Sequence, residues 1–547
     1  MVFFSTLLMS VLLTIALVQV LRPLSLRLRL VDEPGERKVH SRPIPRVGGV
    51  AMAVGIFIPV VLWNYADRFV WAYLSGAAII VAFGMADDSR GLSPRWKLVG
   101  QLAAALLVVQ FGGVRIHTLG TLLPESMVIP GWIAVPLTIL AIIGVTNAIN
   151  LSDGLDGLAG GICLLTFCCI GYLAYLQEDF VPGLIALATA GAIFGFLRFN
   201  TYPAAVFMGD TGSQLLGFTA ITLSLNLTQG NTPLSPILPL ILLGFPILDT
   251  LSVMAVRIAA GRSPFLADRN HFHHNLLALG FQTTESVMVI YACQSLLVLS
   301  AFLFRFHSDG LLLGGYLVFA VLVIALFTVT GRKGWRLKSS TPELRDFFGS
   351  TYLRRMKVEG RVIRSLFRML EIGLPVLLVV TCLLPGTLPW GVAPGAAAVL
   401  VLILAVWRFR KDRLGDVVRV TLYLLIPFIV YKSTTAWLAW VGGAVLLAYS
   451  LSFGALALLD IAVSKLSKRK DGFKSTPLDF LIVFLAVVVP NLPEQNLQAY
   501  SMGLVAAKTI VFYFSFEVLM AEQRGRQESM AAGTVAALAV LIVKGWV

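Results

Sequence analysis

Long apolar runs, separated by short polar segments, recur from one end of the chain to the other. An α-helix needs about 20 apolar residues to cross the hydrocarbon core of a bilayer, and an open sheet cannot satisfy its edges there. The pattern therefore predicts an all-α polytopic membrane protein. A first block of eleven expected spans lies at 3–21, 47–64, 68–86, 98–112, 132–149, 158–176, 181–198, 212–228, 236–257, 286–305 and 311–330. A second block of about seven lies at 370–385, 389–407, 416–431, 434–460, 476–490, 499–520 and 530–546.

A basic segment, rich in Arg and Lys, separates the two blocks from Gly331 to Arg368. We therefore expect three parts. These are a core of about eleven helices at 1–330, a basic cytoplasmic linker at 331–368 and an additional transmembrane domain at 369–547.

The composition excludes a soluble protein, because 57% of the residues are hydrophobic, 13% are charged and the mean hydropathy is +0.85. The net charge of +14 does not indicate nucleic acid, since Lys and Arg gather in cytoplasmic loops of membrane proteins. The five cysteines lie in apolar runs without a CxxC pair, so we expect buried hydrophobes and not metal ligands. Residues 1–21 lack a basic n-region and an A-x-A site, which predicts a retained first span.

The distribution of Lys and Arg predicts the orientation. Loops after the first, third, ninth and eleventh expected spans are basic, whereas 229–235 and 386–388 contain no Lys or Arg. Odd-numbered loops should therefore be cytoplasmic, with both termini outside. Four polar clusters then share the cytoplasmic face, at 87–88, 147–156, 200–210 and 268–274. This layout favours an interfacial enzyme, since a transporter more often places its polar groups near mid-membrane.

The segment Asn147–Gly161, NAINLSDGLDGLAGG, is the strongest candidate site. Asp153 and Asp156 are three residues apart, which places both on one face if the segment is helical. Acids at the mouth of a membrane helix are costly and tend to mark a site. A capped helix start is the structural alternative, but the neighbouring Asn147 and Asn150 favour a site.

Two adjacent carboxylates, Asp87 and Asp88, end the third expected span. They repel each other unless a cation or a proton lies between them, which indicates a hard-cation or general-base site. The alternative is a solvated pair shielded by Arg90 and Lys97. Lys97 opens the next helix and is placed to meet a phosphate as a point charge.

The segment from Asn200 to Gln214, NTYPAAVFMGDTGSQ, contains Asp210. Asp210 begins a corner rich in oxygen ligands, and magnesium prefers carboxylates, waters and substrate phosphates to a full protein cage. Phe207 offers a flat surface for a nucleobase, although ordinary packing alone is the simpler explanation for it.

Three of the six histidines, His271, His273 and His274, follow Arg262 and Arg269 in one segment. A zinc site is one interpretation. The absence of an accompanying cysteine argues against it, and the carboxylate clusters suit magnesium better. We expect these arginines and histidines to bind a phosphate or a sugar, and a solvated basic loop is the alternative.

Together these segments resemble the polyprenyl-phosphate N-acetylhexosamine-1-phosphate transferases of glycosyltransferase family 4. The resemblance is to the branch that begins O-antigen, common-antigen or teichoic-acid linkage-unit synthesis. The peptidoglycan-precursor branch usually lacks an RKxH loop. The matching segments are RKVHSRPIPRVGG, ADDSRGLSPRWK, NAINLSDGLDGLAGG, NTYPAAVFMGDTGSQ and DRNHFHH. They stand in the family order and cover roughly residues 30 to 280.

The resemblance implies transfer of N-acetylhexosamine 1-phosphate, in the first place GlcNAc 1-phosphate, from a UDP-sugar to a polyprenyl phosphate such as undecaprenyl phosphate. UMP would be released, with Mg²⁺ or alternatively Mn²⁺ as cofactor. Such an enzyme would lie in the bacterial inner membrane, with its active site on the cytoplasmic face, and would start cell-envelope glycan synthesis. No nucleic acid is expected as a partner, and a homodimer is one assembly that the resemblance allows.

The resemblance also implies roles for the acidic residues. Asp87 would handle the lipid phosphate, as the base that deprotonates it, and Asp88 would support the metal or the phosphate. Asp210, helped by Asn200, would ligate magnesium on the diphosphate. Direct attack of the lipid phosphate is favoured, and a covalent aspartyl intermediate remains the alternative.

The resemblance also implies that Asp153 and Asp156 are catalytic, and that the remaining candidates, Asn147 among them, bind the substrates. Asn150, Asp153 and Asp156 would orient the nucleotide and the reacting groups. Phe207 would stack on uracil. Lys97 and the histidine segment would grip phosphates and sugar.

The second block departs from the family, whose members often end near the eleventh span. It carries no recognised motif, and its few acids, Asp460 and Glu517, lie near expected span ends, where snorkelling is the expected behaviour. We assign it no chemistry. A flippase or transporter of lipid-linked sugars is the alternative function for the chain, and a structural scaffold ranks last.

Overall fold

The structure, a computed structural model, describes residues 2–28, 31–32, 43–64, 66–124, 127–230, 232–264, 271–332, 361–386, 388–435, 442–466, 502–523 and 528–546. The chain divides into two compact units, whose described parts are 2–332 and 361–546. Within the described residues, 12 helices are long and apolar enough to cross a membrane. The prediction of an all-α polytopic membrane protein is therefore confirmed.

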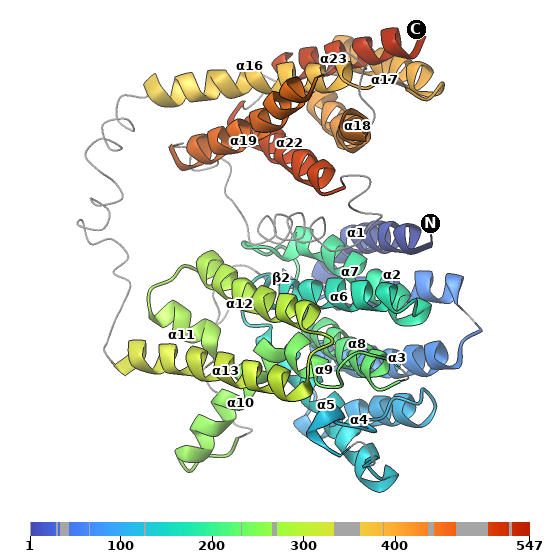
Figure 1. The fold of residues 1–547 in the computed structure, drawn as a ribbon, viewed down its shortest axis with the longest axis vertical. Helices are drawn as coiled ribbons and strands as arrows, with labels where there is room; N and C mark the ends of the chain where they lie inside the picture. The colour runs from blue at the N-terminus through green and yellow to red at the C-terminus, as the bar shows by residue number, and fades with distance from the viewer. Residues whose placement is uncertain are drawn as a thin grey trace. The chain divides into compact units, whose positions relative to one another are not determined.

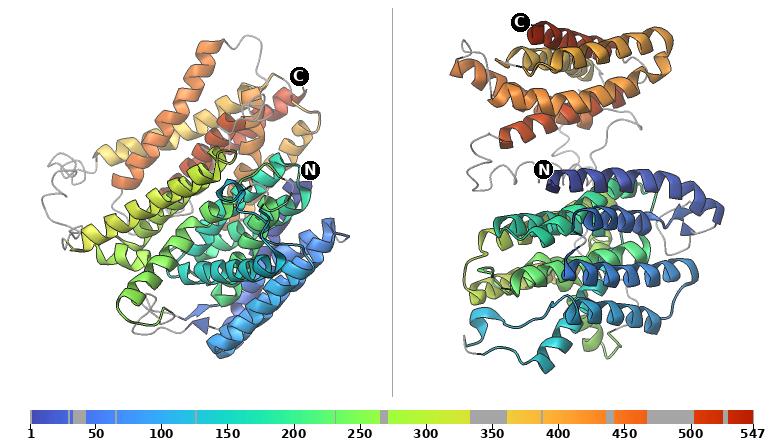
Figure 2. Two further views of the ribbon diagram at one scale, coloured as in Figure 1. Left: turned by 60° about the horizontal axis from the view of Figure 1, so that its bottom comes forward. Right: turned by 90° about the vertical axis from the view of Figure 1, so that its right-hand side faces the viewer.

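The first unit is a bundle of long helices that lie side by side (Figures 1 and 2). Its helices are α1 (Val2–Leu28), α2 (Gly48–Trp63), α3 (Arg68–Arg90), α4 (Pro94–Gln110), α5 (Gly131–Ser152), α6 (Leu158–Leu176), α7 (Phe180–Asn200), α8 (Gly209–Thr228), α9 (Leu238–Leu242), α10 (Gly244–Ala259), α11 (Phe272–Ala278), α12 (Thr283–Leu303) and α13 (Asp309–Arg332). Two short strands, β1 (Val31–Asp32) and β2 (Ile44–Pro45), pair antiparallel between α1 and α2. Each of the eleven expected spans overlaps a helix.

The ninth expected span, 236–257, is not one continuous helix, because it breaks into α9 and α10. Pro246 has no N–H to donate to the carbonyl of Leu242, four residues earlier. That carbonyl instead accepts hydrogen bonds from Gln294 Nε2 at 2.7 Å and Thr166 Oγ1 at 3.1 Å. The sequence pattern did not predict the break, which is tolerated in an apolar bundle because neighbouring helices satisfy the freed carbonyl.

Helix α8 lies at the centre of the first unit and packs against α2, α3, α5 and α6. Nearly all of its side chains are buried. Glycines let the neighbouring backbones approach its first turn. A Cβ at Gly84 would lie 2.5 Å from the Cα of Thr211, and one at Gly49 would clash with Gly212. These contacts hold the ends of α2 and α3 against the start of α8.

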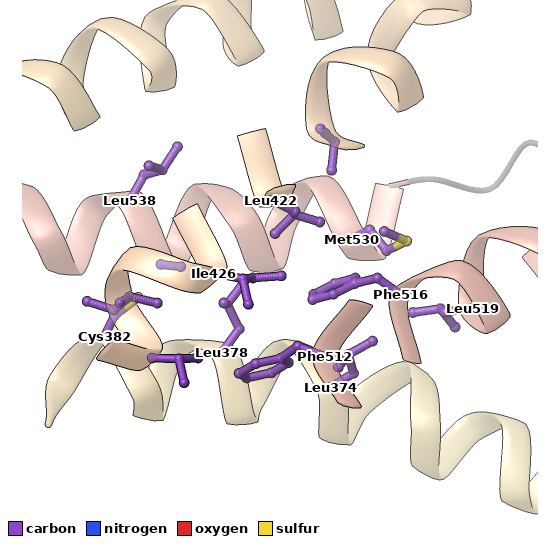
Figure 3. Close-up of a cluster of buried hydrophobic side chains, with 14 of the residues drawn as sticks. Leu374, Leu378, Cys382, Leu422, Ile426, Phe512, Phe516, Leu519, Met530 and Leu538 are labelled. Carbon is purple, nitrogen blue, oxygen red and sulfur yellow. The ribbon is translucent and has the colours of Figure 1, made fainter. Parts of the chain in front are cut away.

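The second unit comprises α16 (Arg361–Leu383), α17 (Val392–Phe409), α18 (Leu414–Thr435), α19 (Gly443–Leu466), α22 (Met502–Gln523) and α23 (Glu528–Trp546). Figure 3 shows its apolar core, in which Phe512 and Phe516 of α22 pack with Leu374, Leu378 and Ile426. The expected span 476–490 and most of the expected linker 331–368 lie outside the described residues.

One expectation for the second unit is wrong. Asp460 does not snorkel to an interface, because α19 continues to Leu466 and the Asp460 side chain is buried. It accepts a hydrogen bond of 2.5 Å from Ser515 Oγ on α22.

Candidate active site

The carboxylate of Asp88, in the last turn of α3, caps the start of α8. It accepts hydrogen bonds from Asp210 N at 2.9 Å, Thr211 N at 3.1 Å and Thr211 Oγ1 at 2.6 Å. The first N–H groups of a helix have no partner within the helix, and the positive end of its dipole favours an anion. Gly209 makes this approach possible, because its φ is +66° and a Cβ there would clash with Asp88. Asp88 thus holds Asp210 in place.

Lys97, in the first turn of α4, bridges two carboxylates that come from different helices. Its ammonium lies 2.5 Å from Asp87 Oδ2 and 2.8 Å from Asp210 Oδ2. The other oxygen of Asp87 accepts a hydrogen bond of 2.6 Å from Leu92 N, in the turn between α3 and α4. The ends of α3, α4 and α8 therefore meet at one cluster of charges.

A buried chain of amides runs from this cluster into the bundle. Gln214, one turn after Asp210, donates to Asp210 Oδ2 at 3.4 Å. Gln101 of α4 donates to Gln214 Oε1 at 3.0 Å, and Asn147 of α5 donates to Gln101 Oε1 at 2.8 Å. Asn147, a predicted substrate-binding residue, thus lies behind Asp210. Neither glutamine was among the predicted site residues, although Gln214 ends the segment NTYPAAVFMGDTGSQ, and Gln101 lies in an apolar run without a motif.

Asp153 and Asp156 lie in the turn between α5 and α6, and not on one face of a helix as their spacing suggested. Helix α5 ends at Ser152, and Gly157 adopts a left-handed conformation with φ of +81° before α6 begins. Asp156 Oδ2 accepts a hydrogen bond of 2.8 Å from Ala204 N, in the loop after α7. At the end of α5, Asn150 donates to Ser213 Oγ of α8 at 2.7 Å.

The environment of Asp153 is strongly negative. Burial, together with the charges of Asp210, Asp88 and Asp156, raises the pKa of Asp153 to about 7. Arg46, just before α2, acts in the opposite direction and also pairs with Asp32 of β1. Four carboxylates from distant parts of the sequence thus influence one another at the cytoplasmic ends predicted for α3, α5 and α8.

Asn200 joins two loops at the edge of this site. Its Oδ1 accepts a hydrogen bond of 3.0 Å from Gly157 N, and its Nδ2 donates to Val206 O at 3.0 Å. Both ends of the buried amide are therefore engaged with the backbone, which favours a positioning role over the predicted role in binding metal. At Phe207, the backbone N–H donates a hydrogen bond to Pro45 O, and the carbonyl accepts one from Gly48 N. The Phe207 side chain is half-buried.

The histidine segment reaches the acidic turn through His273. This ring packs so closely on Gly154 that a Cβ at Gly154 would clash with His273 Nε2. Burial, with a contribution from His274, lowers the pKa of His273 to about 4, so the ring is neutral at pH 7. His271 Nδ1 lies 2.9 Å from Asp249 Oδ2, and this carboxylate also accepts from Phe272 N at 2.8 Å. Asp249 was not predicted, because it lies within an apolar run.

Two further predicted residues are not brought into the cluster by any described contact. Arg262 is exposed in the turn after α10. Arg269 lies outside the described residues.

The donor set suits a magnesium ion that is only partly held by protein. Among the described residues, no three His, Cys, Asp or Glu side chains converge closely enough to hold an ion by themselves. Magnesium usually takes one or two carboxylates and completes its shell with water and substrate phosphates. Asp210, which is partly exposed beside Asp87, fits such a site. The carboxylate oxygens present here fit magnesium or manganese better than zinc.

The family model for glycosyl transferase family 4 matches residues 70–228. This range contains all the predicted aspartates, Lys97, the three asparagines and Phe207.

Curated relatives extend the similarity beyond that range. The chain is 34% identical over 336 residues to a probable undecaprenyl-phosphate N-acetylglucosaminyl 1-phosphate transferase of Bacillus subtilis (strain 168), covering 61% of this chain and 93% of the relative. It is 32% identical over 281 residues to undecaprenyl-phosphate alpha-N-acetylglucosaminyl 1-phosphate transferase of Escherichia coli (strain K12), covering 50% and 77%. It is 32% identical over 340 residues to decaprenyl-phosphate N-acetylglucosaminephosphotransferase of Mycolicibacterium smegmatis, covering 55% and 82%.

Proposed function

This chain belongs to glycosyl transferase family 4, and we propose that it transfers N-acetylglucosamine 1-phosphate from a UDP-sugar to a polyprenyl phosphate. UMP is the second product, and the lipid-linked sugar begins a cell-envelope glycan. The names of three relatives support the lipid acceptor and the transferred sugar phosphate. The observation that carries the proposal is the meeting of Asp87, Lys97 and Asp210 from three helices.

The distribution of charge supports a site on the cytoplasmic face of the membrane. The chain is a multi-pass membrane protein, and the cluster lies at the helix ends that adjoin basic segments, such as Arg90 and Arg95 between α3 and α4. Because Lys and Arg concentrate in cytoplasmic loops, this end faces the cytoplasm of a bacterial inner membrane. A water-borne nucleotide sugar can meet there the phosphate of an acceptor whose hydrocarbon tail stays in the bilayer.

The reaction is a displacement at phosphorus. An oxygen of the lipid phosphate attacks the β-phosphorus of the UDP-sugar, and the bond between this phosphorus and the bridging oxygen breaks as UMP leaves. Both substrates are anionic, so catalysis consists mainly of positioning and of offsetting charge. A divalent ion held by Asp210 and a neighbouring carboxylate would neutralise the diphosphate.

Three residues near the ion have separate roles in the reaction. Asp87 receives the lipid phosphate and any proton it carries, and Lys97 offers its ammonium to a phosphate oxygen. Asp88 acts as a positioning residue, because its oxygens cap α8. Direct attack is favoured over an intermediate on Asp88, because both oxygens of Asp88 accept hydrogen bonds at the start of α8.

The nucleotide and sugar lie towards the turn after α5. Asp153, Asp156 and Asn150 orient the nucleotide, and Phe207 stacks on uracil. His273 is neutral at pH 7, so it hydrogen-bonds a sugar hydroxyl or an amide better than it offsets a phosphate charge.

The test is transfer from radiolabelled UDP-GlcNAc and UDP-GalNAc to polyprenyl phosphate by the purified chain in detergent, with magnesium, manganese or EDTA. We expect a lipid-linked product with UDP-GlcNAc and the loss of transfer in EDTA. Exchange of labelled UMP into UDP-sugar reports the reverse reaction. Absence of both signals, from a protein that remains folded, would contradict the proposal.

A variant of Asp210 tests the proposed role of this residue in binding the metal ion. Asp210→Asn should reduce transfer by at least about a hundredfold, because the amide keeps the shape but loses the charge that holds the ion. Asp249→Asn is a matched carboxylate control away from the ion, and it should retain more activity. Near-normal turnover by Asp210→Asn would rule out the metal role.

A further inference from the structure

The second unit contains a lysine in an unusual position. Lys508 lies in the second turn of α22 and is only 4% exposed. Its ammonium lies 4.2 Å from the centre of the Tyr449 ring and 5.7 Å from that of Phe453, both on α19. A cation over an aromatic face gains some attraction, but a buried charge remains costly unless an anion pairs with it.

No described residue supplies that anion. Among the residues that the structure describes, none accepts a hydrogen bond from the Lys508 ammonium or makes an ion pair with it, and its contacts are with the two aromatic rings. Asp460 is the buried acid on the facing helix, but it is bonded to Ser515. Ser515 follows Lys508 by seven residues, which is about 10 Å along a helix. Phe512, which follows Lys508 by four residues, is buried and packs edge-on against Phe453.

Hydroxyl groups from two further helices lie beside the Tyr449 ring. Its phenolic oxygen donates to Thr381 Oγ1 of α16 at 3.1 Å and lies 3.1 Å from Ser433 Oγ of α18. We call Lys508, Tyr449, Thr381 and Ser433 the Lys508 site. Side chains of α16 and α18 thus meet at the Tyr449 hydroxyl, and the ammonium over the Tyr449 ring has three N–H donors with no acceptor among the described residues.

The position of the Lys508 site does not suit a charge that merely orients the protein. Thr381 and Ser433 lie in the last turns of α16 and α18. Most described basic residues of this unit, such as Arg408 and Arg413, lie at the opposite end of α18, whereas Lys432 and Lys544 lie at the same end as Thr381 and Ser433. Lys508 is therefore at the end with fewer cations, which the positive-inside rule assigns to the outer side, so orientation does not explain it.

We propose that the Lys508 site binds the phosphate headgroup of a lipid. A phosphate oxygen accepts the N–H donors of the ammonium as a charge-assisted hydrogen bond. The hydroxyls of Tyr449, Thr381 and Ser433 already donate within the unit, and they hold the Tyr449 ring in place beside the ammonium. A lipid brings this anion to a membrane unit with its tail already in the bilayer. The proposal does not depend on the transfer reaction assigned to the first unit.

The experiment counts lipids bound to the full chain in detergent by native mass spectrometry, with farnesyl phosphate as the probe and farnesol as its uncharged control. We expect Lys508→Met to bind one farnesyl phosphate fewer per chain than the wild type, with affinity at this site weakened at least about tenfold. Lys411→Met removes an exposed lysine of the same unit and should bind as the wild type does. An equal count for wild type and Lys508→Met overturns the proposal.

Two further measurements separate the alternatives. Inorganic phosphate should not compete with farnesyl phosphate at this site, whereas competition at millimolar concentration would identify free phosphate as the ligand and overturn the assignment to a lipid. Without ligand, Lys508→Met should unfold at the same or a higher temperature, because it removes an unpaired buried charge. A lower unfolding temperature would make Lys508 a structural residue and also overturn the proposal.

Discussion

Asp88 and Thr211 are 123 residues apart in sequence, yet the Asp88 carboxylate accepts hydrogen bonds from both the backbone N–H and the hydroxyl of Thr211. This contact joins the end of α3 to the start of α8. It determines the direction in which the neighbouring Asp210 presents its carboxylate to Lys97.

Asp88→Asn should therefore impair both stability and transfer. The amide nitrogen replaces an acceptor with a donor opposite the N–H groups of Asp210 and Thr211, which costs about 1–3 kcal/mol for buried groups left unpaired. Thermal unfolding and the transfer rate report the two effects. Thr211→Val should resemble a milder form of this variant and Thr211→Ser should resemble the wild type. Unchanged unfolding and transfer in Asp88→Asn would show that the cap has no such role.

The amide chain behind Asp210 can be tested by a double-mutant cycle. Gln101→Leu leaves the amides of Gln214 and Asn147 without their partner, so we expect a loss of about 1–3 kcal/mol and slower transfer. The double variant Gln101→Leu/Gln214→Leu should lose less than the sum of the single variants, because the two side chains contact each other. Unfolding midpoints measure the coupling. Strict additivity would contradict the proposed network.

The contact between Gly154 and His273 predicts a rescue. Gly154→Ala should reduce transfer at least about tenfold, because its Cβ clashes with the imidazole and displaces the turn that carries Asp153 and Asp156. Gly154→Ala/His273→Ala should recover to the activity of His273→Ala alone, since the smaller side chain removes the clash. Transfer rates of the three variants decide this. Failure of the double variant to recover would indicate that Gly154 is needed for another reason.

The raised pKa of Asp153 predicts how metal binding depends on pH. At a pKa of about 7, the carboxyl is half protonated near neutral pH, whereas an unperturbed aspartate is fully ionised. A divalent cation favours the ionised form, so binding releases a proton and the apparent affinity falls as pH falls below about 7, by up to about tenfold per pH unit. Magnesium titrations of transfer at several pH values measure this slope.

Asp153→Asn provides the control for the pH prediction. The amide does not titrate, so the slope between pH 6 and 8 should flatten even if the affinity itself is lower. A slope that persists in this variant would assign the proton to another group.

The sequence predicts the fold correctly wherever one segment decides its own structure. Lipid leaves backbone polar groups no partner but the helix itself, so the apolar runs at 68–86 and 158–176 alone predict α3 and α6. The same runs place the acidic segments at helix ends. The break at Leu243 was missed because it depends on Gln294 and Thr166, which lie on other helices.

The sequence by itself determined that this is an all-helical membrane protein, which helix ends carry carboxylates and which family it resembles, because these depend on local composition and short segments. Only the tertiary structure decided that Asp88 caps α8, that Lys97 joins Asp87 to Asp210, and that Asp153 and Asp156 occupy a turn. Those contacts depend on how closely helices distant in sequence approach, and that distance is set by glycines and buried amides whose partners no local pattern reveals.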